Sequence, residues 1–379
     1  MMDGEQLLSK TINFLRFPLT VAVVFIHFNI VDGFAVGGVE QGANGPGWYC
    51  FIINFLSNVA ARIAVPTFYI ISGFLFFYKA DFSREMYVRK LKSRAMTLLV
   101  PFILWNILAV LWQMKGCLPG LSSLGSPFEL KFTVERVINT FIDKSNNGSI
   151  IVTPSGTAPT EIYPYNTPLW YLRDLIVMVI ISPLIYWCVK KLKLWFVAAA
   201  GVMWYLTSAT FTHECYLYLF SIALFHFSIG AYFSVNRKNL ILEMRRYFKY
   251  MPLVYWPLAV VDALIVDTHG AYYSYYHYAV ILLGVLSAFV VASWLVEKGK
   301  SINKTLTSSS FFVFALHYLL LRQLGVVVFK VSHLPGDNYF AMLIFYFVVP
   351  ALTILACVGT YMLLKRYLPR VCSLLSGGR

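Results

Sequence analysis

The chain has 379 residues, of which 59% are hydrophobic, 17% aromatic and only 13% charged. A soluble domain carries about 25% charged residues, and the mean hydropathy of this chain is +0.68. This composition excludes a soluble globular protein and predicts an all-α, polytopic membrane helix bundle. The N-terminus lacks the basic start and small-residue cleavage site of a signal peptide, so we expect the first span to be retained.

Neither the net charge of +14 nor the six cysteines indicates a special chemistry. Basic residues flank the spans of membrane proteins on the cytoplasmic side, which explains the charge better than a nucleic-acid partner does. The cysteines lack the CxxC or Cys/His spacing of a metal site, and most fall near apolar segments as small buried hydrophobic residues. We therefore expect neither bound nucleic acid nor a bound metal.

A membrane-spanning helix needs about 20 apolar residues, and ten segments of the chain are read as such helices. The second segment is long, and we expect it to bend or break near Arg62 and Pro66. The ten predicted spans are residues 12–31, 50–78, 96–114, 168–188, 194–211, 216–234, 250–267, 275–296, 308–329 and 339–364.

The connections between these spans alternate between ones rich in Lys and Arg and ones almost free of them. By the positive-inside rule, this alternation predicts cytoplasmic N- and C-termini and an even number of spans. We expect one transmembrane domain over residues 1–379, placed in the inner (cytoplasmic) membrane of the cell. Residues 115–167 form the only long connection, between helices three and four on the outer side. Long structureless loops are usually functional or disordered, so both a substrate-binding lid and a passive loop stay open.

The first predicted span holds two ionisable residues, Arg16 and His27. Such residues are costly in a bilayer and indicate a functional site by default. Eleven helical steps of about 100° place both on nearly the same face, roughly 16 Å apart in depth. An imidazole there can act as a general base or as a nucleophile, with hydrogen bonding to a neighbouring helix as the structural alternative. Asp32, Asp174 and Asp262 are the acids that could orient it.

A basic stretch, YVRKLKSRAMTLLVPF, leads into the third span from the cytoplasmic side. One interpretation is an anchor for anionic lipid headgroups. The other is a clamp for the phosphates of a cytosolic, nucleotide-like donor, since Arg suits bidentate phosphate contacts. The basic side chains concerned are Arg89, Lys90, Lys92 and Arg94.

Other polar or small residues lie at membrane depth and could support a substrate or the fold. Ser72 and Gly73 allow close approach of another helix or a thin ligand, although packing alone explains small residues in spans. Arg173 and Asp174 point about 100° apart on a helix, so we expect each to pair elsewhere or to face water. The full set of support residues is Ser72, Gly73, Trp170, Arg173, Asp174 and His317.

The order of these motifs resembles that of the acyltransferase 3 family of integral-membrane acyltransferases. The resemblance rests on Arg-x10-His in the first span, SGFL in the second, the basic stretch ending at a proline, LWYLRDL, SFF…LHY and a basic tail. It runs from about residue 10 to the C-terminus. Without an appended soluble domain, the chain resembles the short, membrane-only form.

The resemblance implies transfer of an acyl group, usually acetyl from acetyl-CoA, to a hydroxyl of a surface carbohydrate or lipid-linked glycan. By position, His27 matches the essential histidine of the family and Arg16 its paired basic residue. Arg94 matches the first arginine of an Arg-x-x-Arg motif that meets the donor, and Thr97 stands in place of the second. The candidates to replace that second arginine are Lys90, Lys92 and Arg89.

The sequence therefore predicts a membrane O-acetyltransferase that uses acyl-CoA as co-substrate. The alternative is a transporter or flippase of a lipid-linked sugar or small anion. Many transporters contain internal repeats, and none is visible here; the Arg/His pair on one helix also favours the enzyme. The sequence indicates neither the identity of the acceptor nor the oligomeric state.

Overall fold

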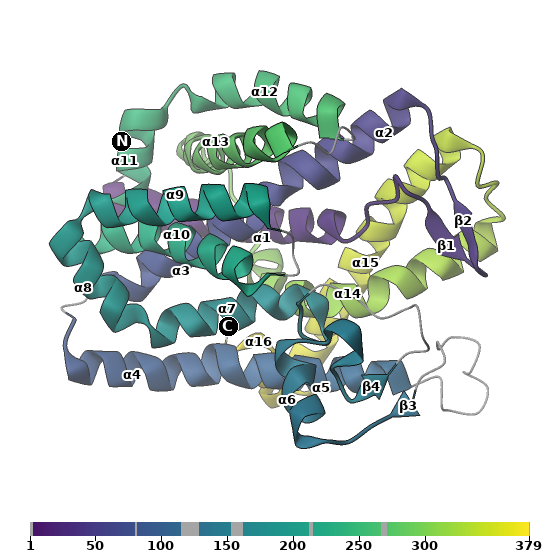
Figure 1. The fold of residues 1–379 in the computed structure, drawn as a ribbon, viewed down its shortest axis with the longest axis horizontal. Helices are drawn as coiled ribbons and strands as arrows, with labels where there is room; N and C mark the ends of the chain where they lie inside the picture. Colours follow the sequence, from purple (N-terminus) through teal and green to yellow (C-terminus); the bar gives the residue numbers. More distant parts are fainter. Residues whose placement is uncertain are drawn as a thin grey trace.

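The computed structural model describes residues 3–79, 82–114, 129–152, 162–211, 215–266 and 271–378. Over these residues the chain is a bundle of long helices with two short antiparallel hairpins at one end (Figure 1). Seven of the described helices are long and apolar enough to cross a membrane, or up to nine if each of two bent helix pairs is one span. The predicted all-α membrane bundle is therefore confirmed.

Each predicted span overlaps an apolar helix, a segmented helix or a bent helix pair. The single long helices are α1 (Gly4–Ile26), α10 (Tyr216–Val235), α13 (Ala271–Glu297), α14 (Lys304–Ser332) and α15 (Tyr339–Tyr367). The segmented helices are α2 (Gly47–Ile53), η1 (Asn54–Ala60), η2 (Ala61–Ile63) and α3 (Ala64–Phe77), then α4 (Arg84–Arg94), η3 (Ala95–Leu99) and α5 (Val100–Gln113). The fifth predicted span, residues 194–211, corresponds to α9 (Leu194–Thr210), whose 17 residues are fewer than a span usually has.

The two bent pairs break where a proline begins the second helix. One pair joins η7 (Thr167–Leu169) and α7 (Trp170–Ile180) to α8 (Ser182–Leu192) at 66°, and the other joins α11 (Leu240–Phe248) to α12 (Met251–Ile265) at 74°. Pro183 and Pro252 lie in the first turns of α8 and α12. Proline lacks an N–H and is pre-set for a first helical turn, so it starts a new helix more readily than it continues one. The irregularity expected near Arg62 is a change of winding, from π to 3-10 to α.

The basic connections gather at one end of the bundle. Figure 1 places the N-terminus, α11, the α3–α4 turn and the α8–α9 turn toward the same side, opposite the hairpins. We call the side with the N-terminus the inner end and the side with the hairpins the outer end. The arrangement agrees with the predicted alternation of charge, while the cytoplasmic location of the termini stays a prediction.

The long outer connection is partly folded, so the expectation of a structureless loop is wrong for its described part. It contains α6 (Val134–Ile142) and a hairpin of β3 (Glu129–Leu130) with β4 (Ile151–Val152). The other hairpin pairs β1 (Phe34–Val36) with β2 (Val39–Gln41). Residues 115–128 and 153–161 of the predicted loop lie outside the described residues.

Helices α3 and α10 cross at very short range through two glycines, Gly73 and Gly230. A Cβ at Gly73 would collide with the carbonyl oxygen of Phe227, and a Cβ at Gly230 with that of Ile70. Backbone atoms cannot swing aside as side chains do, so only glycine allows this approach, as at other close helix contacts in membranes. Of the two roles expected for Gly73, close approach of a helix or of a thin ligand, the structure shows the approach of a helix, α10.

Gly73→Ala should destabilise the protein by about 1–3 kcal/mol, the usual cost of overpacking a well-packed core. Thermal unfolding of the purified protein in detergent measures the effect. Gly359→Ala is the matched control, because nothing lies within 4 Å of a Cβ added there. Equal unfolding temperatures for the two variants would contradict this account of the crossing.

Candidate functional site

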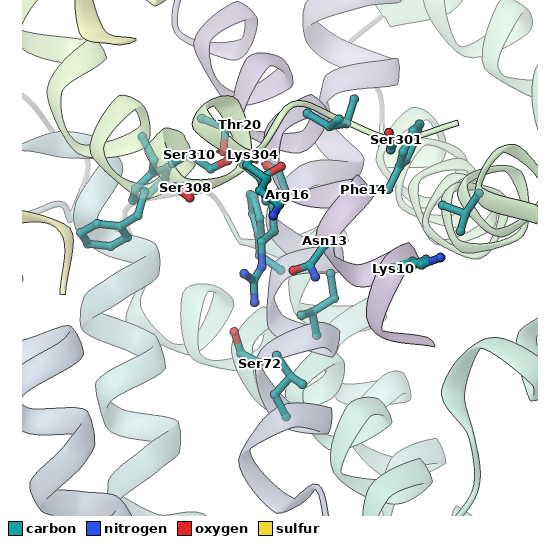
Figure 2. Close-up of a pocket in the computed structure, with 18 of the residues that line it drawn as sticks. Lys10, Asn13, Phe14, Arg16, Thr20, Ser72, Ser301, Lys304, Ser308 and Ser310 are labelled. Carbon is teal, nitrogen blue, oxygen red and sulfur yellow. Dashed lines mark hydrogen bonds between the residues drawn. The ribbon is translucent and has the colours of Figure 1, made fainter. Parts of the chain in front are cut away.

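A cavity of about 1020 Å³ lies at the inner end, among α1, α3, α7, the end of α4 and the connection between α13 and α14. Its volume is at the upper end of the range for small-molecule sites. Apolar side chains form much of its wall, and hydroxyls of Ser72, Ser308 and Ser310 lie on it (Figure 2). Figure 2 shows the guanidinium of Arg16 extending from α1 toward Ser72.

The charges on this cavity are all positive. Its described lining contains five basic side chains and no acidic one, so no carboxylate of the wall balances them. Arg16 and Arg94 are only partly exposed, whereas the three lysines are exposed, and a partly buried guanidinium gains from pairing with an anion. The cavity is therefore suited to an anion. The five basic residues are Lys10, Arg16, Arg94, Lys300 and Lys304.

Of the four basic residues in the stretch before the third span, Arg94 alone lines this cavity. Lys90 turns away: its ammonium contacts the carbonyl oxygen of Phe76 and lies 5.1 Å from the centre of the Phe76 ring. It thereby caps the end of α3, where backbone carbonyls lack helical partners. Arg89 and Lys92 are exposed.

Thr97, which stands in place of a second arginine, also lies outside the lining. Its carbonyl oxygen packs against Gly377, just after α16 (Pro369–Ser376). Lys300 and Lys304 provide cations on the cavity wall instead. The sequence could not separate them from ordinary cytoplasmic basic residues, because their relevance depends on how the α13–α14 connection folds back over α1.

Ser72 and Gly73 separate into two roles. The Ser72 hydroxyl is on the cavity wall and lies 3.0 Å from the hydroxyl of Tyr171, which lines the same cavity. Tyr69 also donates to the carbonyl oxygen of Tyr171, at 3.2 Å. These bonds tie α3 to α7 at the deep side of the cavity, while Gly73 faces α10.

His27 lies directly after the end of α1, which stops at Ile26 and not at the predicted residue 31. The His27 ring is partly exposed, and its centre lies 5.4 Å from that of His317 and 5.3 Å from that of Tyr318. It is not among the residues that line the cavity of Arg16. The single space expected to hold both residues is thus interrupted.

Phe314 and His317 stand in succession between the cavity and His27. Phe314 lines the cavity, and its ring centre lies 6.4 Å from that of His317, which in turn contacts His27. Phe314 and His317 lie on the same face of α14, because residues three apart on a helix are neighbours. These two rings therefore connect the wall of the cavity to His27.

His317 is buried and has a defined hydrogen-bonding pattern. Its Nδ1 lies 3.1 Å from the carbonyl oxygen of Val313 and 2.8 Å from that of Phe314. Carbonyls only accept hydrogen bonds, so Nδ1 donates and the neutral ring keeps its lone pair on Nε2. That Nε2 has no hydrogen-bond partner among the described residues. His317 can therefore accept a proton or a hydrogen bond beside His27.

The other side of His27 carries aromatic and basic groups from the outer connection. The Lys144 ammonium donates to the Thr167 hydroxyl at 2.5 Å and lies 5.9 Å from the ring centres of both Tyr165 and Tyr318. Burial raises the pKa of the Tyr165 hydroxyl, so this hydroxyl stays protonated and neutral near pH 7. Sequence analysis missed Lys144 because only the folding of the outer connection brings it to Tyr318.

Arg173 and Asp174 pair with each other, so the expectation that they would pair elsewhere is wrong. Arg173 Nε donates to Asp174 Oδ1 at 2.7 Å, and both side chains are nine-tenths buried. The flexible arginine stem spans the angle between the two helical positions. Arg173 Nη1 also donates to the carbonyl oxygens of Ile142 and Ile162, at 2.7 and 3.1 Å. The pair therefore fastens the outer connection to α7.

Two other support residues also have defined partners. Trp170 stacks on Tyr163, with ring centres 6.1 Å apart, at the same outer connection. Asp262, an acid that could have oriented His27, accepts a hydrogen bond from Nδ1 of His277 at 2.8 Å. This buried pair joins α12 to α13, and the sequence offers no spacing signal for it because the two residues lie on different helices.

The fold and the site define a multi-pass membrane protein with a basic cavity at its inner end and a histidine cluster beyond it. A family model described as an acyltransferase domain matches residues 9–362. The chain therefore belongs to the acyltransferase 3 family, as the motifs predicted, and it is a membrane acyltransferase.

One curated relative extends this assignment over the whole chain. The chain is 26% identical over 402 aligned positions to the succinoglycan biosynthesis protein ExoH of Rhizobium meliloti (strain 1021), with 100% of this chain and 94% of the relative covered. No solved structure matches significantly.

Arg173→Met should lower the free energy of unfolding by about 3–5 kcal/mol, because it leaves the Asp174 carboxylate buried without its partner. Lys131→Met is the control, since the Lys131–Glu129 pair is exposed on both sides, and exposed pairs contribute about 0–1 kcal/mol. Thermal unfolding compares the two, and amide hydrogen exchange in α6 reports release of the outer connection. A Lys131 effect as large as the Arg173 effect would contradict the clamp.

Proposed function

We propose that the protein transfers an acyl group from cytosolic acyl-CoA to a hydroxyl of a cell-envelope carbohydrate. The observation that carries this proposal is the inner cavity, with five basic residues and no acidic one on its described wall. Coenzyme A bears a diphosphate and a 3′-phosphate, so it is strongly anionic at the end away from its thioester. The cavity lies at the end with the basic connections, which the positive-inside rule assigns to the cytosol.

Arg16 and Arg94 are the proposed main phosphate ligands. The planar guanidinium fork matches phosphate oxygens bidentately, and both side chains extend from the helices that frame the cavity. Lys300 and Lys304 add positive charge from the α13–α14 connection. With its phosphates held there, the donor directs its narrow pantetheine arm past Phe314, toward His317 and His27.

His27 is the proposed general base. As the acceptor oxygen attacks the thioester carbonyl, His27 takes the hydroxyl proton; the C–S bond then breaks, an ester C–O bond forms, and the thiolate of CoA receives the proton. His317 supports this role, because its unprotonated Nε2 can hold the N–H of His27 and leave the other nitrogen of His27 free to accept. No metal is needed for this sequence of steps.

The relative supports a polysaccharide acceptor and widens the choice of acyl group. A protein of succinoglycan biosynthesis acts on a polysaccharide pathway, which agrees with a carbohydrate or lipid-linked glycan as acceptor. The same name points to succinyl beside the acetyl group expected from the sequence. We propose that the enzyme resides in the inner membrane with both termini in the cytosol.

Arg16→Gln and Arg94→Gln should each weaken CoA binding about 10- to 100-fold, since a hydrogen bond to a charged group contributes about 1.5–3 kcal/mol. Thermal stabilisation by CoA measures binding without turnover, because a ligand selective for the folded state raises apparent stability. Lys92→Gln, an exposed position outside the cavity, is the control. If Lys92→Gln weakens binding as much as the arginine variants do, the donor binds elsewhere.

His27→Ala should abolish acyl transfer while leaving stabilisation by CoA unchanged, because His27 lies outside the cavity that holds the phosphates. A coupled assay of CoA release and the unfolding temperature with and without CoA give the two readouts. General bases contribute about 10²–10⁴-fold to the rate, so a loss below tenfold would remove His27 from the chemistry.

A further inference from the structure

Two basic side chains beside His27 are not used by the proposed reaction. Lys144 interacts with the Thr167 hydroxyl and with the rings of Tyr165 and Tyr318, and Arg62 Nη2 donates to the amide oxygen of Asn58 at 3.4 Å. All these partners are neutral. Within the described part of the chain, neither cation forms an ion pair with a carboxylate.

Lys144 and His27 share a neighbour. The Tyr318 ring lies 5.3 Å from the ring of His27 and 5.9 Å from the ammonium of Lys144. Lys144 and Arg62 are also close enough to His27 to act on it electrostatically. The side chains of His27, Tyr318, Lys144 and Arg62 are all partly exposed, so a substrate can reach this cluster.

The position of Lys144 is fixed by its backbone. Its amide donates to the carbonyl oxygen of Tyr163 at 2.8 Å, in the segment that Arg173 fastens to α7. The adjacent acid, Asp143, forms no ion pair with Lys144 among the described contacts; its carboxylate accepts hydrogen bonds from the Ser145 amide and the Tyr216 hydroxyl. The backbone of Lys144 and its contact with Thr167 thus hold the ammonium in place, and in the described part of the chain no carboxylate pairs with it.

An acetyl group carries no anionic group that Lys144 or Arg62 could bind. A partly buried ammonium beside a reacting thioester gains most from a second anionic group on the acyl chain, through a short charge-assisted hydrogen bond. In a four-carbon diacid, standard bond lengths place the free carboxyl carbon about 4 Å from the thioester carbon. A hydrogen bond of about 2.8 Å then reaches an ammonium one ring away from the base.

We infer that Lys144, assisted by the charge of Arg62, is the recognition site for a carboxylate at the far end of the acyl group, so that the preferred donor carries a dicarboxylic acyl chain of the succinyl class. This inference rests on the proposed function and adds a specificity-determining residue to it. Lys144 reads the acyl chain while Arg16 and Arg94 hold the phosphates, which are common to all acyl-CoA donors.

The test compares succinyl-CoA and acetyl-CoA as donors for the full-length wild-type protein, Lys144→Gln and Lys144→Arg. Lys144→Gln should lower kcat/KM for succinyl-CoA at least tenfold and change that for acetyl-CoA less than threefold, and Lys144→Arg should restore most of the succinyl activity. Lys131→Gln, an exposed lysine on the same outer connection, should behave as wild type. Equal losses with both donors, or no loss, would overturn the inference.

Two further arms separate the alternatives. Hydrolysis of the donors without acceptor removes any acceptor carboxylate, so a succinyl-specific loss there supports the inference, whereas a loss confined to anionic acceptors overturns it. Thermal stabilisation by the two donors needs no turnover. If the wild type transfers neither group, the proposed function fails, and the carboxylate site is judged from thermal stabilisation alone. Stronger stabilisation of the wild type by succinyl-CoA than by acetyl-CoA, lost in Lys144→Gln, supports the site. Equal stabilisation of the wild type by the two donors overturns it.

Discussion

Positive charge without a counter-charge is the constraint on which the rest of this structure depends. Arg16, Arg94 and three lysines face one cavity in a bundle that is mostly apolar, and the described wall of that cavity holds no acid. The lysines are exposed, but Arg16 and Arg94 are partly buried, and partly buried guanidinium groups gain from pairing with an anion. The cavity is therefore suited to an anion that the described part of its wall does not supply. In the proposed function the phosphates of acyl-CoA satisfy this requirement, and the family assignment gives the class of reaction, acyl transfer.

The proposed chemistry is divided along α14. Its inner part, with Ser308, Ser310 and Phe314, borders the basic cavity, and one turn further His317 and Tyr318 contact His27. The Arg173–Asp174 pair holds the outer connection against α7, and this connection brings Lys144 to Tyr318. A buried ion pair therefore serves to position a segment of the site. Phe314 and His317 connect the wall of the cavity to His27 through successive ring contacts.

Hydropathy and charge patterning predicted most of the architecture, because span length and basic flanks are local properties of the sequence. All ten predicted segments overlap apolar helices, although the end of α1 at Ile26 was misplaced by five residues. The pairing of Arg173 with Asp174 was predicted wrongly, since helical angles describe Cβ directions and not the reach of a long side chain. Other features depend on contacts between segments that are distant in the sequence. They are the contribution of Lys304 to the cavity, the position of Lys144 beside Tyr318 and the Asp262–His277 pair. No local pattern in the chain encodes them.

The most direct measurement is an experimental structure of the protein with coenzyme A bound, in lipid or detergent. The account predicts density for the phosphates against Arg16 and Arg94, a Phe314 ring displaced from its present position, and the thiol end within reach of His317 and His27. Phosphates bound instead at the exposed Arg89 and Lys92, or a thiol directed away from α14, would contradict the central claim that the unbalanced charge of the inner cavity exists to hold the donor.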